Sequence, residues 1–283
     1  MQKKRKLLLL ITLMALLIAF ISWVIWDNGR ITVTEYTVSD SEIPESFNGY
    51  RIVQVSDLHN AEFGKDNILL LGMIKELQPD IILLTGDLID SYHTNVDISL
   101  RFVQQVVDIA PAYYVTGNHE VRIPEDYQRL KTGMEAAGVT VLDSAVTLER
   151  NSETVTLLGV PDPSATGLHP EFYTQITDRL LEEKVTGDMC YRILLCHRPE
   201  VFEAFEDNGI DLAFSGHTHG GQIRLPLIGA LFSPDQGLFP QYDMGIFTEE
   251  DTTMIISRGL GNSSFPFRVN CPPEIVAVTL IHE

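Results

Sequence analysis

The chain has 283 residues, 45% of them apolar, which is enough for one large domain with its own core. After residue 26, 16 basic side chains stand against 39 acidic ones, a formal charge of -23. A surface this acidic repels nucleic-acid phosphates, so we expect no nucleic-acid partner, and the oligomeric state does not follow from the sequence.

The first 26 residues differ sharply in composition from the rest. Residues 1–6 form a basic tail, and residues 7–26 carry no charged side chain. As a helix, this run would be about 30 Å long, which is the thickness of the hydrocarbon core of a bilayer. We therefore expect a single-pass signal anchor in the cell membrane at 7–26, with the tail in the cytoplasm and the globular domain on the extracytoplasmic side.

Two alternatives for this segment stay open. A cleaved signal peptide has a shorter apolar core, about 7 to 15 residues, and a cleavage site flanked by small residues. The segment could also be a buried helix of a soluble protein. Residues 27–49 are expected to form a linker and a lead-in strand, followed by one domain at 50–283.

From residue 50 onward, short β-branched runs alternate with amphipathic stretches, a pattern typical of a layered α/β domain. The expected strands lie at 51–56, 81–85, 113–116, 139–142, 146–149, 155–160, 191–196, 212–214, 222–225, 253–257 and 275–281. The expected helices lie at 65–77, 96–109, 124–137, 171–183 and 199–206, with a hairpin turn at Asn151 and Ser152. Two packed sheets flanked by helices accommodate this order.

Five of these strands run directly into residues that can bind a metal ion. The segments are Asp57-Leu58-His59, Gly86-Asp87, Gly117-Asn118-His119-Glu120, His197 and Gly216-His217-Thr218-His219. Open α/β sheets place their sites beyond the carboxyl ends of strands, so these five loops can converge on one crevice. Each motif alone is weak evidence, and the prediction of a metal site depends on all five occurring together.

The mixture of ligand types indicates the kind of metal. Carboxylate and amide oxygens combined with imidazoles suit Mn²⁺, iron, Zn²⁺ or Co²⁺. Cys190, Cys196 and Cys271 lack metal-ligand spacing, which argues against a structural zinc site. Two metal ions about 3.5 to 4 Å apart can share a carboxylate and a bridging hydroxide and clamp a phosphoryl group.

Through these motifs the sequence resembles the calcineurin-like metallophosphoesterase superfamily over residues 50–283. A closer likeness to its bacterial, membrane-associated YkuE/YaeI-type phosphodiesterase branch comes from Gly220-Gly221-Gln222, Ser257-Arg258-Gly259-Leu260-Gly261, and Arg268 followed by Pro272-Pro273-Glu274. The resemblance implies a four-layer αββα sandwich, with two mixed β-sheets flanked by helices. It also implies two divalent metal ions, Mn²⁺ foremost, with iron or Zn²⁺ possible.

The resemblance further implies a role for each site residue. One metal would be held by Asp57, His59, Asp87 and His219, and the other by Asp87, Asn118, His197 and His217, so that Asp87 bridges. His119 would face the substrate and donate a proton to the leaving oxygen or stabilise charge. Asp90 resembles the carboxylate that orients this histidine, a cap on the following loop being the alternative. Arg258 and Arg268 could contact phosphate oxygens, or form buried structural pairs instead.

The implied activity is hydrolysis of phosphoric esters, by a phosphodiesterase or phosphomonoesterase, through attack of a metal-bridging hydroxide. One alternative is a pyrophosphohydrolase acting on a UDP-diacylglucosamine-like or other lipid-linked substrate. A second alternative is a noncatalytic metal-binding scaffold. The apolar stretch from Gln222 to Phe247 could form a rim that receives a lipid-linked phosphate, or a folded loop that covers the core.

Overall fold

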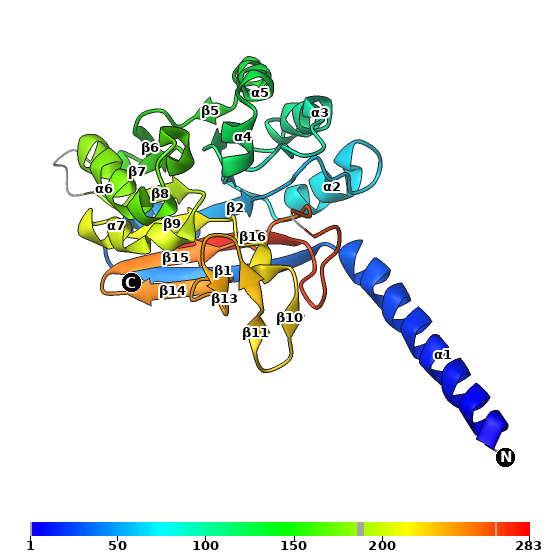
Figure 1. The fold of residues 1–283 in the computed structure, drawn as a ribbon. Helices are drawn as coiled ribbons and strands as arrows, with labels where there is room; N and C mark the ends of the chain where they lie inside the picture. The colour runs from blue at the N-terminus through cyan, green and yellow to red at the C-terminus, as the bar shows by residue number, and fades with distance from the viewer. Residues whose placement is uncertain (1, 186–189, 264) are drawn as a thin grey trace.

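The computed structural model describes residues 2–185, 190–263 and 265–283, and within them it has two six-stranded mixed sheets (Figure 1). The first sheet runs, in spatial order, β1 (Thr32–Asp40), β16 (Glu274–His282), β2 (Arg51–Val55), β3 (Ile81–Leu84), β4 (Ala112–Tyr114) and β5 (Thr140–Val141). The second runs β14 (Gly245–Glu249), β15 (Thr252–Ile256), β9 (Leu212–Ser215), β8 (Arg192–Cys196), β7 (Glu153–Val160) and β6 (Val146–Arg150).

The central strands are buried on both faces, because each sheet lies between the other sheet and a layer of helices. In β2, Ile52 packs between the two sheets, whereas the next residue, Val53, packs beneath the helices. In β8, Ile193 likewise packs between the two sheets, and Leu194 packs beneath the helices that cover the second sheet. The four-layer αββα arrangement expected from the sequence is therefore confirmed.

The outer layers are helical. The first sheet is covered by α2 (Ile68–Glu76), α3 (Val96–Val106) and α5 (Pro124–Ala137), and the second by α6 (Tyr173–Lys184) and α7 (Phe202–Asp207) (Figure 1). Strand β1, in the expected lead-in segment, pairs in parallel with β16 along its whole length. The segment before residue 50 is thus part of the first sheet.

The strands that end in the five motifs run parallel within each sheet. This holds for β2, β3 and β4 in the first sheet and for β8 and β9 in the second. Gln54 joins the two sheets close to these ends, because its Nε2 donates to Thr85 Oγ1 at 3.0 Å and to the Ser215 carbonyl at 2.8 Å. The carboxyl ends of both sets of strands therefore meet at one edge of the sandwich.

Some element boundaries differ from the expectation for local reasons. The helix expected at 65–77 begins only at Ile68, because Asp66 and Asn67 have φ of +53° and +61°. The short helix α4 (Asn118–Arg122) and strand β14 were not expected. The hairpin turn at Asn151 and Ser152 is confirmed, with both residues at positive φ between β6 and β7.

The N-terminal helix α1 (Gln2–Asn28) extends away from the domain (Figure 1). It is long and apolar enough to cross a membrane, and its apolar part is not buried against the domain. The alternative of a buried helix in a soluble core is therefore wrong. Signal sequences share these properties, so the length and composition of α1 leave the choice between anchor and cleaved signal open.

The apolar stretch from Gln222 to Phe247 covers the core only at its end. It contains two small hairpins, β10 (Arg224–Leu225) with β11 (Gly229–Ala230) and β12 (Phe232–Ser233) with β13 (Gly237–Leu238). Most large apolar side chains of these hairpins are exposed, most of all Leu227, whereas Tyr242 and Phe247 pack against the core of the second sheet. The core-covering loop raised by the composition is therefore observed only for the last part of the stretch.

Candidate metal centre

The five loops at the carboxyl ends of β2, β3, β4, β8 and β9 bring their polar side chains into one buried cluster. All seven proposed metal ligands and the proposed acid are less than a tenth exposed: Asp57, His59, Asp87, Asn118, His119, His197, His217 and His219. Buried polar groups need partners, so the contacts of each one decide what the cluster can bind.

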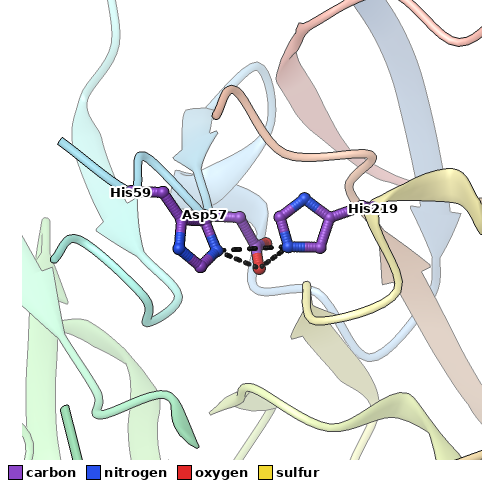
Figure 2. A group of neighbouring side chains, drawn as sticks. All are labelled: Asp57, His59 and His219. Atoms are coloured by element: carbon purple, nitrogen blue, oxygen red, sulfur yellow. Dashed lines mark hydrogen bonds and ion pairs between the residues drawn. The ribbon is translucent and has the colours of Figure 1, made fainter. Parts of the chain in front are cut away.

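Asp57, His59 and His219 form the first part of the cluster (Figure 2). Nε2 of His219 lies 3.3 Å from Asp57 Oδ1, and Nε2 of His59 lies 3.9 Å from the same oxygen. The two imidazole nitrogens also face each other at 3.2 Å. Two ring nitrogens and a carboxylate oxygen directed at one point form a set of donors that fits a divalent cation.

Asp87 lies between this group and the second part of the cluster. Its Oδ2 is 3.5 Å from Nε2 of His59 and 3.3 Å from Nε2 of His197. Burial would raise the pKa of Asp87, but His197 and His59 outweigh burial and lower that pKa well below its ordinary value. An ionised carboxylate between two sets of imidazoles is placed where one ligand can serve two metal ions.

Among the described residues, the second part of the cluster contains buried polar atoms whose hydrogen bonding is incomplete. His197 Nδ1 donates to the Thr85 carbonyl at 2.7 Å, which leaves Nε2 as the nitrogen that can bind a cation. Asn118 Oδ1 is buried without a hydrogen-bond partner, and His197 Nε2 faces the Asp87 carboxylate at 3.3 Å. An unsatisfied buried polar atom costs about 1 to 3 kcal/mol, and a bound cation would satisfy both atoms. The residues therefore fit a metal ion.

The Nε2 side of the His217 ring contacts a network of charged side chains that was not identified from the sequence. Its Nε2 lies 3.2 Å from Asp235 Oδ2 and 3.2 Å from Arg198 Nη1. Arg198 is itself buried, and it also bonds Asp162 at 2.7 Å and Glu200 at 3.0 Å. His217 and Arg198 hold the pKa of Asp235 below its ordinary value against the effect of burial. Arg198 directly follows His197, but no local pattern marks Asp235.

His119 lies next to the cluster, with its ring 4.4 Å from the ring of His59. The Ser91 amide donates to His119 Nδ1 at 3.0 Å, which places the proton of the neutral ring on Nε2. Burial, with smaller contributions from His59 and Arg122, lowers the pKa of His119 to about 4, although the charges of Asp87 and Asp90 act in the opposite direction. The ring is therefore neutral at pH 7.

Asp90 contacts both His119 and the loop that follows Asp90, the two roles that the sequence analysis considered for it. Its Oδ1 lies 3.4 Å from His119 Nδ1 and accepts the Tyr92 amide at 2.8 Å. The carboxylate thus contacts the histidine and also closes the loop that follows.

Glu120 is fully buried and ties two of the ligand loops together. Its Oε2 accepts the amides of Asp87 and Gly117, each at 2.9 Å, and its Oε1 accepts the Ile89 amide at 3.2 Å. Burial and the charge of Asp87 raise the pKa of Glu120 to about 7, although the amide donors oppose this shift. The side chain positions Asp87 without facing the cluster itself.

The backbone around the cluster is strained. The positive-φ residues include five of the proposed ligands, which are Asp57 (51°), His59 (46°), Asp87 (52°), His217 (69°) and His219 (52°). Such conformations are rare for residues other than glycine, and they concentrate at functional sites. Gly216 is required by close approach, since a Cβ there would lie 1.9 Å from Ser56 Oγ.

The two arginines proposed for substrate binding are both engaged by the protein. Arg258 donates to Glu274 Oε1 at 2.6 Å. Arg268 is fully buried, donates to the Arg258 carbonyl at 2.8 Å, and has Nη2 3.1 Å from His219 Nδ1. Both arginines thus form the buried structural contacts that the sequence analysis gave as the alternative to contacts with phosphate oxygens.

Comparison with known proteins identifies the family to which the segment with these motifs is similar. Residues 50–221 match the family described as calcineurin-like phosphoesterase. The chain is 32% identical to an uncharacterized metallophosphoesterase, YkuE, of Bacillus subtilis, over 90% of this chain and 87% of that protein. It is 28% identical to phosphodiesterase YaeI of Escherichia coli, over 82% of each chain.

More distant similarities also occur. A transmembrane protein with a metallophosphoesterase domain from Danio rerio is 26% identical over 88% of this chain and 57% of that protein. Among solved structures, a putative 5'-nucleotidase from Staphylococcus aureus has a TM-score of 0.49 and 15% identity, over 83% of this chain and 55% of that one.

Proposed function

Because this chain belongs to the calcineurin-like phosphoesterase family and is a phosphoester hydrolase, we propose that it hydrolyses its substrate at a centre of two divalent metal ions. The position of Asp87 Oδ2, between the imidazoles of His59 and His197, is the observation that carries this proposal. When bound, the two ions supply an activated water and positive charge for the phosphoryl oxygens.

The residues divide into two ligand sets around Asp87. Asp57, His59 and His219 would hold one ion, and Asn118, His197 and His217 the other. This combination of oxygen and imidazole ligands suits Mn²⁺ foremost, with iron and Zn²⁺ also compatible. The alternative function of a noncatalytic metal-binding scaffold is not favoured, because the chain belongs to a family of phosphoesterases.

His119 would act on the leaving group. Its neutral ring carries the proton on Nε2, since the Ser91 amide occupies Nδ1. A neutral imidazole can donate a hydrogen bond from Nε2 to the leaving oxygen and so stabilise the negative charge that develops there as the ester bond breaks. The Ser91 amide would hold the ring in this orientation, and Asp90 would shape the turn that carries this amide, because its Oδ1 accepts the Tyr92 amide.

We further propose that α1 anchors the enzyme in the cell membrane. The basic tail at 1–6 would stay in the cytoplasm, residues 7–26 would span, and the catalytic domain at 50–283, preceded by the segment 27–49, would lie on the extracytoplasmic side. Transmembrane relatives with a metallophosphoesterase domain support an anchored arrangement.

For the substrate, a phosphodiester is the first candidate, because the relative YaeI is named a phosphodiesterase. A lipid-linked phosphoester or pyrophosphate, such as a UDP-diacylglucosamine-like molecule, is the second. A cavity of about 570 Å³ supports this second candidate, with Phe63, Leu69, Met73 and Leu260 in its wall. The cavity also borders Asn28, where α1 ends, and Gly261, which packs against His59. An acyl chain in this cavity would lie between the membrane helix and the metal centre.

The experiment that tests the proposed function is hydrolysis of bis-p-nitrophenyl phosphate and p-nitrophenyl phosphate by the full chain in detergent, beside Asp87→Asn. Metal-dependent turnover that disappears in Asp87→Asn supports the dinuclear centre, and the ratio of the two rates gives the ester preference. Asp143→Asn, an exposed carboxylate that bonds Lys131, is the matched control. Turnover that persists in Asp87→Asn would contradict the proposal.

A further inference from the structure

Large apolar side chains are exposed on two segments of the catalytic domain. One is the hydrophobic hairpin, residues 224–230, in which Leu227 is fully exposed and Ile228 is 59% exposed. The other is the aromatic turn, residues 265–267, in which Phe265 and Phe267 are 43% and 42% exposed. Exposed apolar groups gathered in this way mark a surface that contacts another apolar phase.

The two segments are joined to each other at their bases. Ile223 forms a β-bridge with Val269, and the Arg224 amide donates to the Val269 carbonyl at 3.0 Å. Gln222 adds a side-chain bond, since its Nε2 donates to the Phe265 carbonyl at 3.1 Å. The hydrophobic hairpin and the aromatic turn therefore form one surface with a fixed relative position.

This surface is also fastened to the end of the apolar helix. The side chain of Asn28, the last residue of α1, donates from Nδ2 to the Arg268 carbonyl and accepts the Arg268 amide at Oδ1, each at 2.7 Å. Arg268 immediately follows the aromatic turn. The point where α1 leaves the domain and the base of the exposed apolar surface are thus held together by two hydrogen bonds.

The arrangement in space agrees with these contacts. In Figure 1 the β10–β11 hairpin and the loop before Arg268 protrude from the domain on the side from which α1 departs. A bilayer crossed by α1 would lie on that side. No such membrane contact is expected for α6, on the far side of the domain (Figure 1).

Leu227 lies at the tip of the hydrophobic hairpin. The Ile228 amide donates to the Leu225 carbonyl at 3.2 Å and closes a β-turn with Pro226 and Leu227 at its centre. The φ of +69° at Leu227 is that of the third residue of a type II turn. The turn leaves the Leu227 side chain fully exposed, as expected of a residue that enters an apolar environment.

We propose that the hydrophobic hairpin and the aromatic turn insert into the interfacial layer of the bilayer that α1 spans, which makes a second membrane contact beside the anchor. The inference rests on the proposed role of α1 as a membrane anchor. The domain carries a charge of -23, so anionic headgroups would repel it and insertion must depend on apolar contact. The contact would hold the cavity beside Asn28 open to the lipid layer, where a lipid-linked phosphoester would enter.

Tryptophan fluorescence can test this inference, because the two natural tryptophans, Trp23 and Trp26, both lie in α1. The full chain is placed in phosphatidylcholine vesicles that contain lipids brominated along the acyl chain, which quench only tryptophans within the bilayer. One reporter chain carries Leu227→Trp and another Phe267→Trp, each with Trp23→Phe and Trp26→Phe. Both reporters should be quenched by the brominated lipids and protected from aqueous iodide.

The matched control is Phe172→Trp in the same background, since Phe172 is 46% exposed, like Phe267, and immediately precedes α6 on the far side of the domain. It should be quenched by iodide and not by brominated lipids. Each chain must hydrolyse bis-p-nitrophenyl phosphate at the native rate, which shows that it is folded.

The native chain separates the failure of the anchor from the failure of this inference. If Trp23 and Trp26 are quenched by brominated lipids but both reporters respond only to iodide, the anchor stands and the second contact is overturned. If the natural tryptophans are not quenched, the anchor proposal fails, and the inference of a second contact beside the anchor fails with it. If they are quenched, the reporters decide the inference. Quenching of both reporters supports it, and iodide access to both overturns it.

Discussion

Asp235 Oδ2 lies 3.2 Å from Nε2 of His217, and this contact leaves Nδ1 as the nitrogen of that ring that can bind a metal ion. The carboxylate comes from the stretch between β12 and β13, 18 residues beyond His217. A carboxylate that accepts from a ligand imidazole fixes its orientation and raises its basicity. Asp235 would therefore position His217 for the second of the two proposed metal ions.

Asp235→Ala should weaken the second metal site. Loss of such a partner reduces metal affinity by about 10- to 100-fold, and we expect this loss for one ion only, because Asp57, His59 and His219 do not contact Asp235. Titration of the metal-free chain with Mn²⁺ measures the two affinities. The control is Asp251→Ala, an exposed carboxylate. Two unchanged affinities would show that Asp235 does not position His217.

His119→Ala should slow hydrolysis by about 10²- to 10³-fold while both metal ions remain bound, because the hydrogen bond from Nε2 to the leaving oxygen is lost. The loss should be larger for a phenyl ester than for a p-nitrophenyl ester, because p-nitrophenolate spreads its charge over the ring and depends less on that bond. The measurement is the ratio of the two rates in each protein. A loss that is equal for both esters would show that His119 does not act on the leaving oxygen.

Glu120→Gln should destabilise the protein and disturb the Asp87 loop. The amide oxygen of glutamine can replace only one carboxylate oxygen, and its NH₂ group would face at least one of the backbone amides of Asp87, Gly117 and Ile89. A buried donor left without an acceptor costs about 1 to 3 kcal/mol. A thermal melt of the metal-free chain measures this loss, and a native melting temperature would contradict it.

Asp211→Asn should stabilise the protein at neutral pH but not at acidic pH. Burial, and then the charges of Glu42 and Asp40, raise the pKa of Asp211 to about 6, against the bond it accepts from the Arg192 amide. A folded-state pKa above the unfolded one means that stability falls as pH rises from about 4 through 6.

The expected gain for Asp211→Asn is about 1 kcal/mol at pH 8, after reduction for solvent screening, and none at pH 3.5. Asparagine can still accept the Arg192 amide, so the difference isolates the charge. Urea unfolding at the two pH values measures it, with the exposed Asp251→Asn as control. An equal effect at both pH values would rule out ionisation as the cause.

The cluster was predictable because its ligands directly follow buried strands. Asp57 comes two residues after β2 and His197 one residue after β8, so local patterns of apolar residues indicate where these side chains emerge. The parallel direction of the strands then brings their ends together. Sequence reasoning could therefore place the ligand loops, although they are up to about 160 residues apart.

The partners of these ligands were harder to predict, since they depend on tertiary contacts. Asp235 lies in an irregular stretch and reaches His217 only in the folded chain. The same stretch shows that composition does not determine burial, because Leu227 and Leu238 are exposed whereas Phe247 packs against the core. Strand β14 was not expected because its partly exposed residues lack a clear alternation.

The measurement that tests the central claim most directly is the rate of bis-p-nitrophenyl phosphate hydrolysis by the metal-stripped full chain as Mn²⁺ is added. If two ions share Asp87, the rate should be near zero without metal and should reach its full value only after two equivalents have bound, as counted by elemental analysis. Full activity in the stripped chain, or after a single equivalent, would contradict the dinuclear centre.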